Sequence, residues 1–395
     1  MIQPQLPDPT QSDKPVIVYI DTKSPYAYLS VGPTRALERH LGLRFDWRPF
    51  VLDIPSYLGS ARLDKAGNVV EQQRSEAQWA GVKYAYYDCR RYARLSGLRI
   101  RGTEKIWDTQ LVSAAMWWVR AQGAAVLDEF IDRVYAPFWV RDLDVESETV
   151  IRDLLNALGA GGDSFLAWYC AAGASESAAF QERAFGEGIY GVPTYLVAGE
   201  RYFGREHLPR VAWHIESGCA SDAADDPDVR TPPDVAYTVD ESIADEAAWS
   251  VVREVTVGVD MSLDSLLALP QLVNALRDFP GEVRWMRMPQ KVFYQSPADN
   301  DDSRANVHRR CRLENEQANL RRYRPEGLQV SSFSPLIERL LLRHGIELAD
   351  AGDSPISDPR APGIQVMLDE EPFIGRQHLP LVRRRLEHAR GLAAS

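Results

Sequence analysis

One motif occurs twice in this sequence. Residues 202–211 and residues 373–382 share a Gly-Arg-x-His-Leu-Pro core, in which Gly204 pairs with Gly375 at an offset of 171 positions (375 minus 204). Each copy follows a short hydrophobic run typical of a β-strand and precedes a pattern typical of a helix. A chain of 395 residues is long enough for two cores. The repeat therefore predicts two related domains.

The segment before the first copy reads as an α/β domain. The β-branched run Val16–Ile20 predicts a buried strand, a helix should follow from Pro25 to about His40, and Leu43–Phe50 predicts a second, parallel strand. Apolar residues at helical spacing then predict a long helical insertion that includes Ala77–Leu95 and Thr109–Ala121. The domain should end with a β-hairpin, strands 195–197 and 201–203, and a helix over 208–215.

The second copy closes a shorter version of the same plan. We expect strands at 251–259 and 282–288, a helix at 265–276 between them, and an insertion reduced to roughly 335–344. The predicted domains are a flexible N-terminal tail (1–14), the first domain (15–218), an Ala-, Asp- and Pro-rich linker (219–249) and the second domain (250–392).

Composition excludes several classes of function. A net charge of −11 argues against a nucleic-acid surface, and no apolar run reaches the length that spans a membrane. The polar start of the chain lacks the features of a signal peptide, and four scattered cysteines form no C-x-x-C pair. We therefore expect a cytoplasmic protein without a dithiol redox centre or a metal site.

Ser24 occupies the N-cap of the first predicted helix, directly after the first strand. Free N–H groups and the helix dipole favour an anion there, and a serine hydroxyl can donate a hydrogen bond to it. A thiolate would be stabilised at this point, but it would have to come from a ligand, because the chain has no cysteine there. The alternative is that Ser24 serves only as an N-cap.

A second candidate lies where the hairpin begins. Pro193 enters a predicted strand near the Ser24 end of the sheet, which suggests a cis peptide after Val192. That geometry would turn the Val192 backbone toward an extended, peptide-like ligand. The alternative is a proline that merely begins a strand.

Several segments together resemble one family. The opening strand and helix (residues 18–29), the Lys-x-x-Tyr-type helix (83–90), the Trp-acidic segment (138–144), and the closing motifs (188–194 and 203–208) are similar to those of 2-hydroxychromene-2-carboxylate isomerases and kappa-class glutathione transferases. Both groups have a DsbA-like thioredoxin fold. The resemblance covers about residues 15–218, and the second copy then reads as a degenerate thioredoxin-like domain.

The resemblance implies a thioredoxin-like sheet with an inserted helical bundle, and bound glutathione as the cofactor. Ser24 would hold the glutathione sulfur as a thiolate, and Val192, before cis-Pro193, would pair with the cysteinyl backbone. Glu206 would bind the γ-glutamyl amino group. Lys83 is a candidate partner for a carboxylate of glutathione or of the substrate, and Asn68 matches a family asparagine that lies beside glutathione.

Three positions depart from the family pattern. Glu206 stands in place of an aspartate, so its contact with the amine is displaced by one methylene. Arg205 is bulkier than the residue usual there. Lys23 replaces an apolar residue and puts a cation beside the sulfur site, where it would lower a thiol pKa or pair with a different anion.

The second copy lacks the expected site. Counted without gaps, Ile364 takes the place of Pro193, and alignment of Pro33 with Pro270 puts Met261 opposite Ser24. A domain that keeps the scaffold but loses these residues is most simply a packing partner or a lid. A homodimer, and a pseudo-dimer formed by the two domains of one chain, both remain open.

The leading hypothesis is a glutathione-dependent isomerase of the 2-hydroxychromene-2-carboxylate type, acting on an aromatic-degradation intermediate or a related unsaturated acid. The borrowed thiolate would be the nucleophile. Trp107 and Trp139 are candidates for the wall of the substrate pocket. The alternatives are a kappa-like transferase or reductase that uses the same site, and a non-catalytic thioredoxin-like binding module.

Overall fold

The computed structural model describes residues 3–64, 68–216, 233–238, 249–288, 298, 301–321, 333–350 and 363–394. The chain forms two compact units. The first comprises Met1–Pro233 and Pro297–Asn319, and the second comprises Asp234–Ser296 and Leu320–Ser395. Most of the expected linker (residues 219–232 and 239–248) lies outside the described residues.

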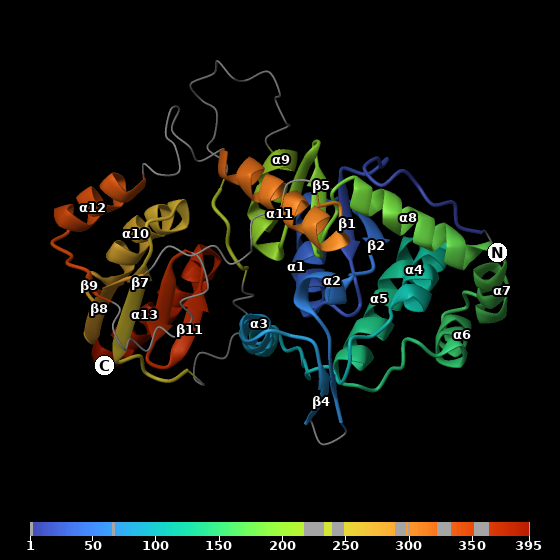
Figure 1. Cartoon of the computed structure of the whole chain (residues 1–395), viewed down its shortest axis with the longest axis horizontal. Coiled ribbons are helices and arrows are strands. Elements are labelled where there is room, and N and C mark those ends of the chain that lie inside the picture. Colours follow the sequence, from blue (N-terminus) through green and yellow to red (C-terminus); the bar gives the residue numbers. More distant parts are fainter. Residues whose placement is uncertain are drawn as a thin grey trace, which may run out of the picture. The chain divides into compact units, whose positions relative to one another are not determined.

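A four-stranded mixed sheet forms the centre of the first unit (Figure 1). Its order is β2 (Asp46–Pro49), β1 (Val16–Ile20), β5 (Thr194–Val197) and β6 (Glu200–Phe203), with β1 parallel to β2 and antiparallel to β5. Every residue of β1 is buried, as its unbroken apolar run predicts. The predicted β-α-β unit and the closing hairpin are confirmed.

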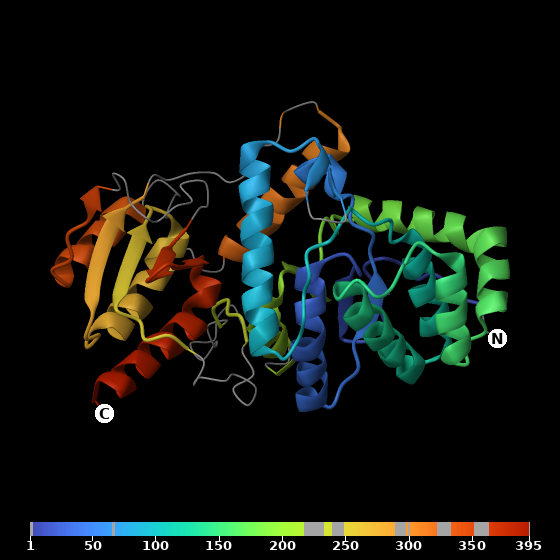
Figure 2. The ribbon, with the colours of Figure 1, turned by 90° about the horizontal axis from the view of Figure 1, so that it is seen from below.

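Helix α1 (Pro25–Leu41) makes the crossover between the two parallel strands. It begins after Ser24 and ends at Gly42, whose φ of 64° lies in the left-handed region that favours glycine. Figure 2 shows α3 (Glu76–Leu95) running alongside α1. One contact between them joins the Tyr26 hydroxyl to Asp88 Oδ2, 3.4 Å away.

The helical insertion lies between β2 and β5, and its helices α4 to α8 gather to one side of the sheet (Figures 1 and 2). Ahead of α3 the structure has a short helix and a β-hairpin that the sequence did not predict, α2 (Ile54–Leu58), β3 (Ala61–Leu63) and β4 (Val69–Gln72). The remaining helices of the unit are α4 (Gln110–Gln122), α5 (Ala124–Trp139), α6 (Glu148–Ala157), α7 (Gly162–Trp168), α8 (Ala174–Gly186) and α9 (Leu208–Glu216).

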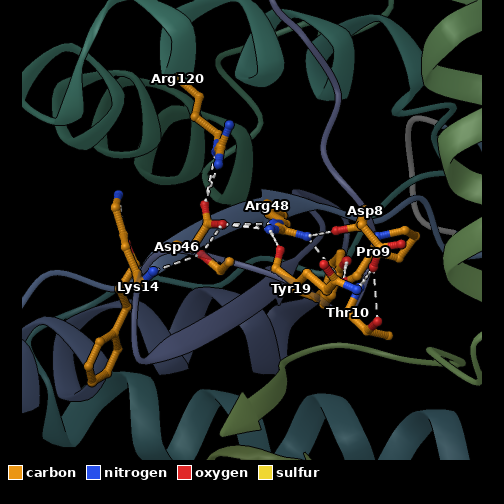
Figure 3. Close-up of polar contacts among 11 residues, drawn as sticks. Asp8, Pro9, Thr10, Lys14, Tyr19, Asp46, Arg48 and Arg120 are labelled. Carbon is orange, nitrogen blue, oxygen red and sulfur yellow. Dashed lines mark hydrogen bonds and ion pairs between the residues drawn. The ribbon is translucent and has the colours of Figure 1, made fainter. Parts of the chain in front are cut away.

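The N-terminal residues contact one buried arginine (Figure 3). Arg48 on β2 donates to the carbonyl oxygens of Asp8 (2.6 Å), Pro9 (3.1 Å) and Gln11 (2.5 Å). Its guanidinium also binds Asp46 Oδ2 at 2.7 Å. Because a buried guanidinium must satisfy its N–H groups, it fixes the backbone that accepts from it.

A helix from the second half of the sequence also belongs to the first unit. Helix α11 (Arg304–Arg321) was not predicted, and its residues up to Asn319 lie in this unit. Asn315 Nδ2 donates to the Tyr190 hydroxyl at 3.2 Å, directly ahead of the Val192 segment. The sequence 304–321 carries few apolar residues and no apolar stripe, so its pattern did not indicate a helix.

The second unit repeats the strand order of the first. Its sheet runs β11 (Glu371–Ile374), β10 (Gln365–Leu368), β7 (Glu254–Val259), β8 (Glu282–Arg287) and β9 (Ala349–Asp350). Strand β7 pairs parallel with β8 and antiparallel with β10, as β1 does with β2 and β5. The helices are α10 (Leu263–Leu276), α12 (Phe333–Arg343) and α13 (Leu379–Ala394). Among the described helices of the whole chain, none is long and apolar enough to cross a membrane.

Candidate active site at the start of helix α1

Ser24 is the N-cap of α1, as its place in the sequence predicted. Its backbone is extended (φ −93°, ψ 115°), and its Oγ accepts a hydrogen bond from Ala27 N at 3.2 Å. The same hydroxyl donates to the carbonyl oxygen of Val192 at 3.4 Å. A serine that is 5% exposed is thus placed between the first turn of a helix and the start of β5.

The peptide bond between Val192 and Pro193 is cis, as predicted, and it is the one cis bond found in the described parts of the chain. The segment ahead of it packs closely. A Cβ atom added to Gly191 would collide with the ring of Phe203, and that ring lies 5.1 Å from the ring of Tyr190, centroid to centroid. This packing holds the Val192 carbonyl toward Ser24.

Lys23 is buried beside Ser24, with its ammonium 3.3 Å from the carbonyl oxygen of Trp107. The carboxylate of Asp21 is 3.8 Å away. That carboxylate already accepts from Leu52 N at 2.8 Å and from Thr109 Oγ1 at 2.8 Å. The loop after β1 is therefore tied to the insertion through Asp21 and Lys23.

A cavity of about 690 Å³ opens beside Lys23. Its walls come from the loop after β1, from the end of β2, from α4 and α8, and from α11, and they include the aromatic side chains of Trp107, Trp117 and Phe180. Trp107 lines the cavity as suspected from the sequence. Trp139 does not, because it is 1% exposed and its ring stacks on Tyr28, with centroids 6.5 Å apart.

Arg304 is the contribution of α11 to the cavity wall. Its guanidinium binds Asp53 Oδ2 at 3.0 Å and Glu182 at 2.9 Å, and it lies over the ring of Phe185 at 4.3 Å. Sequence reasoning missed this residue, because nothing in its surroundings links position 304 to a site near position 24. The one available signal was the run of basic residues on a segment outside the repeated plan.

Glu206 lies in the turn after β6, with its carboxyl group folded back against Gly204. A Cβ atom at Gly204 would collide with that carboxyl group, and the φ of 107° there also favours glycine. Burial raises the pKa of Glu206 to about 7, and the nearby guanidiniums of Arg205 and Arg312 oppose the shift. Burial therefore favours the protonated form of Glu206.

Lys83 and Asn68 lie apart from this arrangement. Lys83 is exposed on α3. Asn68 is exposed ahead of β4, where its side chain donates to Asp64 Oδ2 at 3.0 Å. In the described parts of the chain, no hydrogen bond or ion pair joins either residue to Ser24.

In the second unit the equivalent position is filled by the chain itself. The N-cap of α10 is Ser262, one residue after the Met261 that was expected opposite Ser24, because Pro270 follows its N-cap by one residue fewer than Pro33 does. Strand β10 begins after Ile364 as β5 begins after Pro193. The amides of Gly363 and Ile364 donate to the carboxylates of Asp260 (2.8 Å) and Asp264 (3.0 Å).

Other chemistry has little support in the described residues. Cys89, Cys170 and Cys311 are free thiols, and burial raises the pKa of Cys89 well above its usual range, which disfavours a thiolate. Cys219 lies outside the described residues. Within the described ranges, no cluster of His, Cys, Asp and Glu side chains could hold a metal ion.

Comparison with known proteins agrees with this fold. A family model described as "DSBA-like thioredoxin domain" matches residues 15–216. A solved 2-hydroxychromene-2-carboxylate isomerase is similar over 53% of this chain and 97% of its own, at 20% identity and a TM-score of 0.41. A probable DsbA oxidoreductase from Streptomyces coelicolor is similar over 51% of this chain and 88% of its own, at 18% identity and a TM-score of 0.38. No curated protein matches the chain.

Proposed function

Because the chain belongs to the DSBA-like thioredoxin domain family, we propose that its first unit is a glutathione-dependent isomerase. It would be of the 2-hydroxychromene-2-carboxylate isomerase type and act on an aromatic-degradation intermediate or a related unsaturated acid. The observation that carries this proposal is the position of Ser24. Its hydroxyl lies at a helix start beside the Val192 carbonyl, and the preceding residue, Lys23, lines a cavity that also has aromatic walls.

The residues present fit glutathione. The chain offers a serine hydroxyl at the N-terminus of a 17-residue helix, where a thiolate is favoured by a hydrogen bond and by the helix dipole. Val192 and Pro193 provide the backbone segment opposite that hydroxyl. Glu206 offers a carboxylate for the γ-glutamyl amino group once it is ionised.

The chain has distinct tasks in this scheme. Glutathione would supply the nucleophilic sulfur when bound. Ser24 would turn its hydroxyl hydrogen from the Val192 carbonyl toward the sulfur and so favour the thiolate, and the aromatic rings that line the cavity would face the substrate. Lys83 and Asn68 would contact only the outer parts of the ligand, because both are exposed.

The same site would serve a glutathione transferase or reductase. The two activities differ in their products, since an isomerase returns free glutathione after each turnover whereas a transferase releases a conjugate. Mass spectrometry of the products, with glutathione present below the substrate concentration, separates them. Turnover beyond one equivalent of glutathione without its consumption identifies the isomerase.

Binding of glutathione by wild type, Ser24→Ala and Ser30→Ala tests the proposal. Ser30 is the matched control, because it is a buried serine of the same helix whose hydroxyl donates to the Ala27 carbonyl at 2.7 Å. Calorimetry should show binding in wild type and Ser30→Ala, with a lowered thiol pKa by thiolate absorbance, and a weakened site with a higher thiol pKa in Ser24→Ala. Absence of binding in all three proteins would overturn the proposal.

A further inference from the structure

We propose that Lys23 determines which second ligand the site accepts, by binding a carboxylate of a planar, conjugated acid held in the cavity that Lys23 lines. The inference rests on the proposed function for the reaction that follows binding. The binding itself is argued from the contacts of Lys23 and from the walls of the cavity. Neither the repeated motif nor the family pattern contains this lysine.

The ammonium of Lys23 is buried, and the described residues supply only part of the hydrogen bonds that it can donate. Its side chain is 6% exposed. Of the three hydrogens on the ammonium, the Trp107 carbonyl oxygen accepts one at 3.3 Å. The closest carboxylate oxygen, on Asp21, is 3.8 Å away, which is beyond hydrogen-bond distance.

Asp21 is also poorly placed to complete the pair. Its two oxygens accept hydrogen bonds from Leu52 N, Thr109 Oγ1 and, at 3.3 Å, the backbone N–H of Lys23 itself. A buried ammonium is costly unless it is paired and fully hydrogen-bonded. An anionic ligand in the adjoining cavity would supply the missing acceptor.

The cavity offers aromatic surface and the Lys23 ammonium to a flat ligand with a carboxylate. Asp53, Asp108 and Glu182 also line it, and Asp53 and Glu182 are paired with Arg304. A volume of about 690 Å³ lies in the range of small-molecule sites. Trp107, Trp117 and Phe180 contribute aromatic surface, and Lys23 is a cation adjacent in sequence to Ser24. A carboxylate at Lys23 would thus place the conjugated part of the ligand near the sulfur that Ser24 would hold.

The competing interpretation is that Lys23 only ties the Trp107 loop to β1 through the bond to the Trp107 carbonyl. A charge-selective binding test separates the two. Cinnamate and its neutral isostere cinnamamide serve as probes, followed by calorimetry on wild type, Lys23→Met and Lys105→Met. Lys105 is the control, because its ammonium lies over the same Trp107 ring, 4.4 Å from the centroid, but pairs with Glu146.

Wild type should bind cinnamate about tenfold or more tightly than cinnamamide, as expected for a charge-assisted hydrogen bond. Lys23→Met should lose this preference, Lys105→Met should keep it, and Lys23→Arg, which retains a cation, should keep most of it. If Lys23→Met does not fold, Lys23→Gln takes its place. Equal binding of the two probes by wild type, or an unchanged preference without the lysine charge, would overturn the inference.

The test is independent of glutathione. A protein that fails to bind glutathione but prefers cinnamate through Lys23 would overturn the proposed function and leave the carboxylate site standing. A protein that binds glutathione through Ser24 without any preference for cinnamate would leave the proposed function standing and overturn the carboxylate site at Lys23. The two failures are therefore distinguishable with the same purified variants.

Discussion

The imidazole ring of His308 stacks on the phenol ring of Tyr57, with centroids 4.2 Å apart and planes inclined by 9°. Tyr190 meets the same imidazole edge-on at 5.3 Å. His308 lies on α11, Tyr57 on α2 and Tyr190 ahead of cis-Pro193, so these rings anchor α11 beside the candidate site. A segment outside the repeated plan thus becomes part of the first unit.

This anchor should depend on pH. Burial, helped by the positive charges of Arg312 and Arg309, lowers the pKa of His308 to about 4. A histidine whose pKa is depressed on folding contributes stability that is present above about pH 6.5 and is lost as the pH falls toward 4. His308→Phe keeps a ring for stacking but cannot be protonated.

We expect wild type to lose about 3 kcal/mol more unfolding free energy than His308→Phe between pH 6.5 and pH 4. Urea denaturation at a series of pH values, with hydrogen exchange of α11, measures this. His40→Phe is the control, because it makes the same substitution at an exposed histidine outside α11. Parallel profiles for wild type and His308→Phe would contradict the prediction.

Arg48 should be far more important to stability than its neighbour Arg44. Burial alone would raise the pKa of Asp46, but the guanidiniums of Arg48 and Arg120 lower it on balance, so the group is a buried ion cluster (Figure 3). Removing one partner of a buried ion pair costs about 3–5 kcal/mol. Arg48→Met should lose that much unfolding free energy and expose residues 3–13 to proteolysis.

Arg44→Met provides the comparison. The side chain of Arg44 is 47% exposed, and its pair with Asp128 is at the surface, so its loss should cost less than about 1 kcal/mol. Chemical denaturation and limited proteolysis with mass mapping of the N-terminus report both effects. Similar losses for the two variants, or an N-terminus that stays protected in Arg48→Met, would refute the role given to Arg48.

Glu206 should make glutathione binding pH-dependent. Because burial raises its pKa to about 7, the carboxylate that would bind an ammonium group forms only as the pH rises through 7. Wild type should therefore gain affinity between pH 6 and pH 8, whereas Glu206→Gln should bind weakly at both. Calorimetry at the two pH values measures the difference, with Glu216→Gln, an exposed glutamate on α9, as the control.

The same group should oppose folding when it ionises. A carboxyl group whose pKa is raised on folding contributes stability that is present below about pH 4.5 and is lost as the pH rises to about 7. For Glu206 the loss of unfolding free energy is roughly 3 kcal/mol. Glu206→Gln should therefore be more stable than wild type at pH 8. A variant that loses affinity and also stability at pH 8 would point to misfolding and not to a lost contact.

Much of the first unit could be predicted, because its strands are unbroken apolar runs and its helices carry regular apolar spacing. Val16–Ile20 and the hairpin around Ala198-Gly199 are examples. Ser24 could be located because capping is a local property of three or four residues. The cis bond at Pro193 was likewise signalled by a proline at the entry to a strand.

The remaining features depend on contacts between distant residues. No local pattern shows that Arg48 is buried by the carbonyls of residues 8–11, or that the polar sequence of α11 docks on Tyr57. The cavity beside Lys23 is likewise assembled from the loop after β1 and from α4, α8 and α11. Side-chain packing and polar contacts between distant segments create these three features, and the residues that make such contacts have no fixed spacing in the sequence.

The second unit should not bind glutathione at its equivalent position, because its own acids occupy it. Asp264 accepts from Ile364 N and also binds Arg376, whose guanidinium contacts Asp234 at 2.9 Å. Asp264→Ala should therefore cost about 1–3 kcal/mol, because Arg376 loses one of its two carboxylates but keeps Asp234, and it should remove the hydrogen-exchange protection of the Ile364 amide. Glu282→Ala is the control, because its pair with Arg284 is exposed and its loss should cost less than about 1 kcal/mol.

Glutathione should bind wild type and both variants with one equivalent per chain and similar affinity, since the residues of the Ser24 site are unchanged. A second equivalent bound by wild type would show that the acids of the second unit do not block its site.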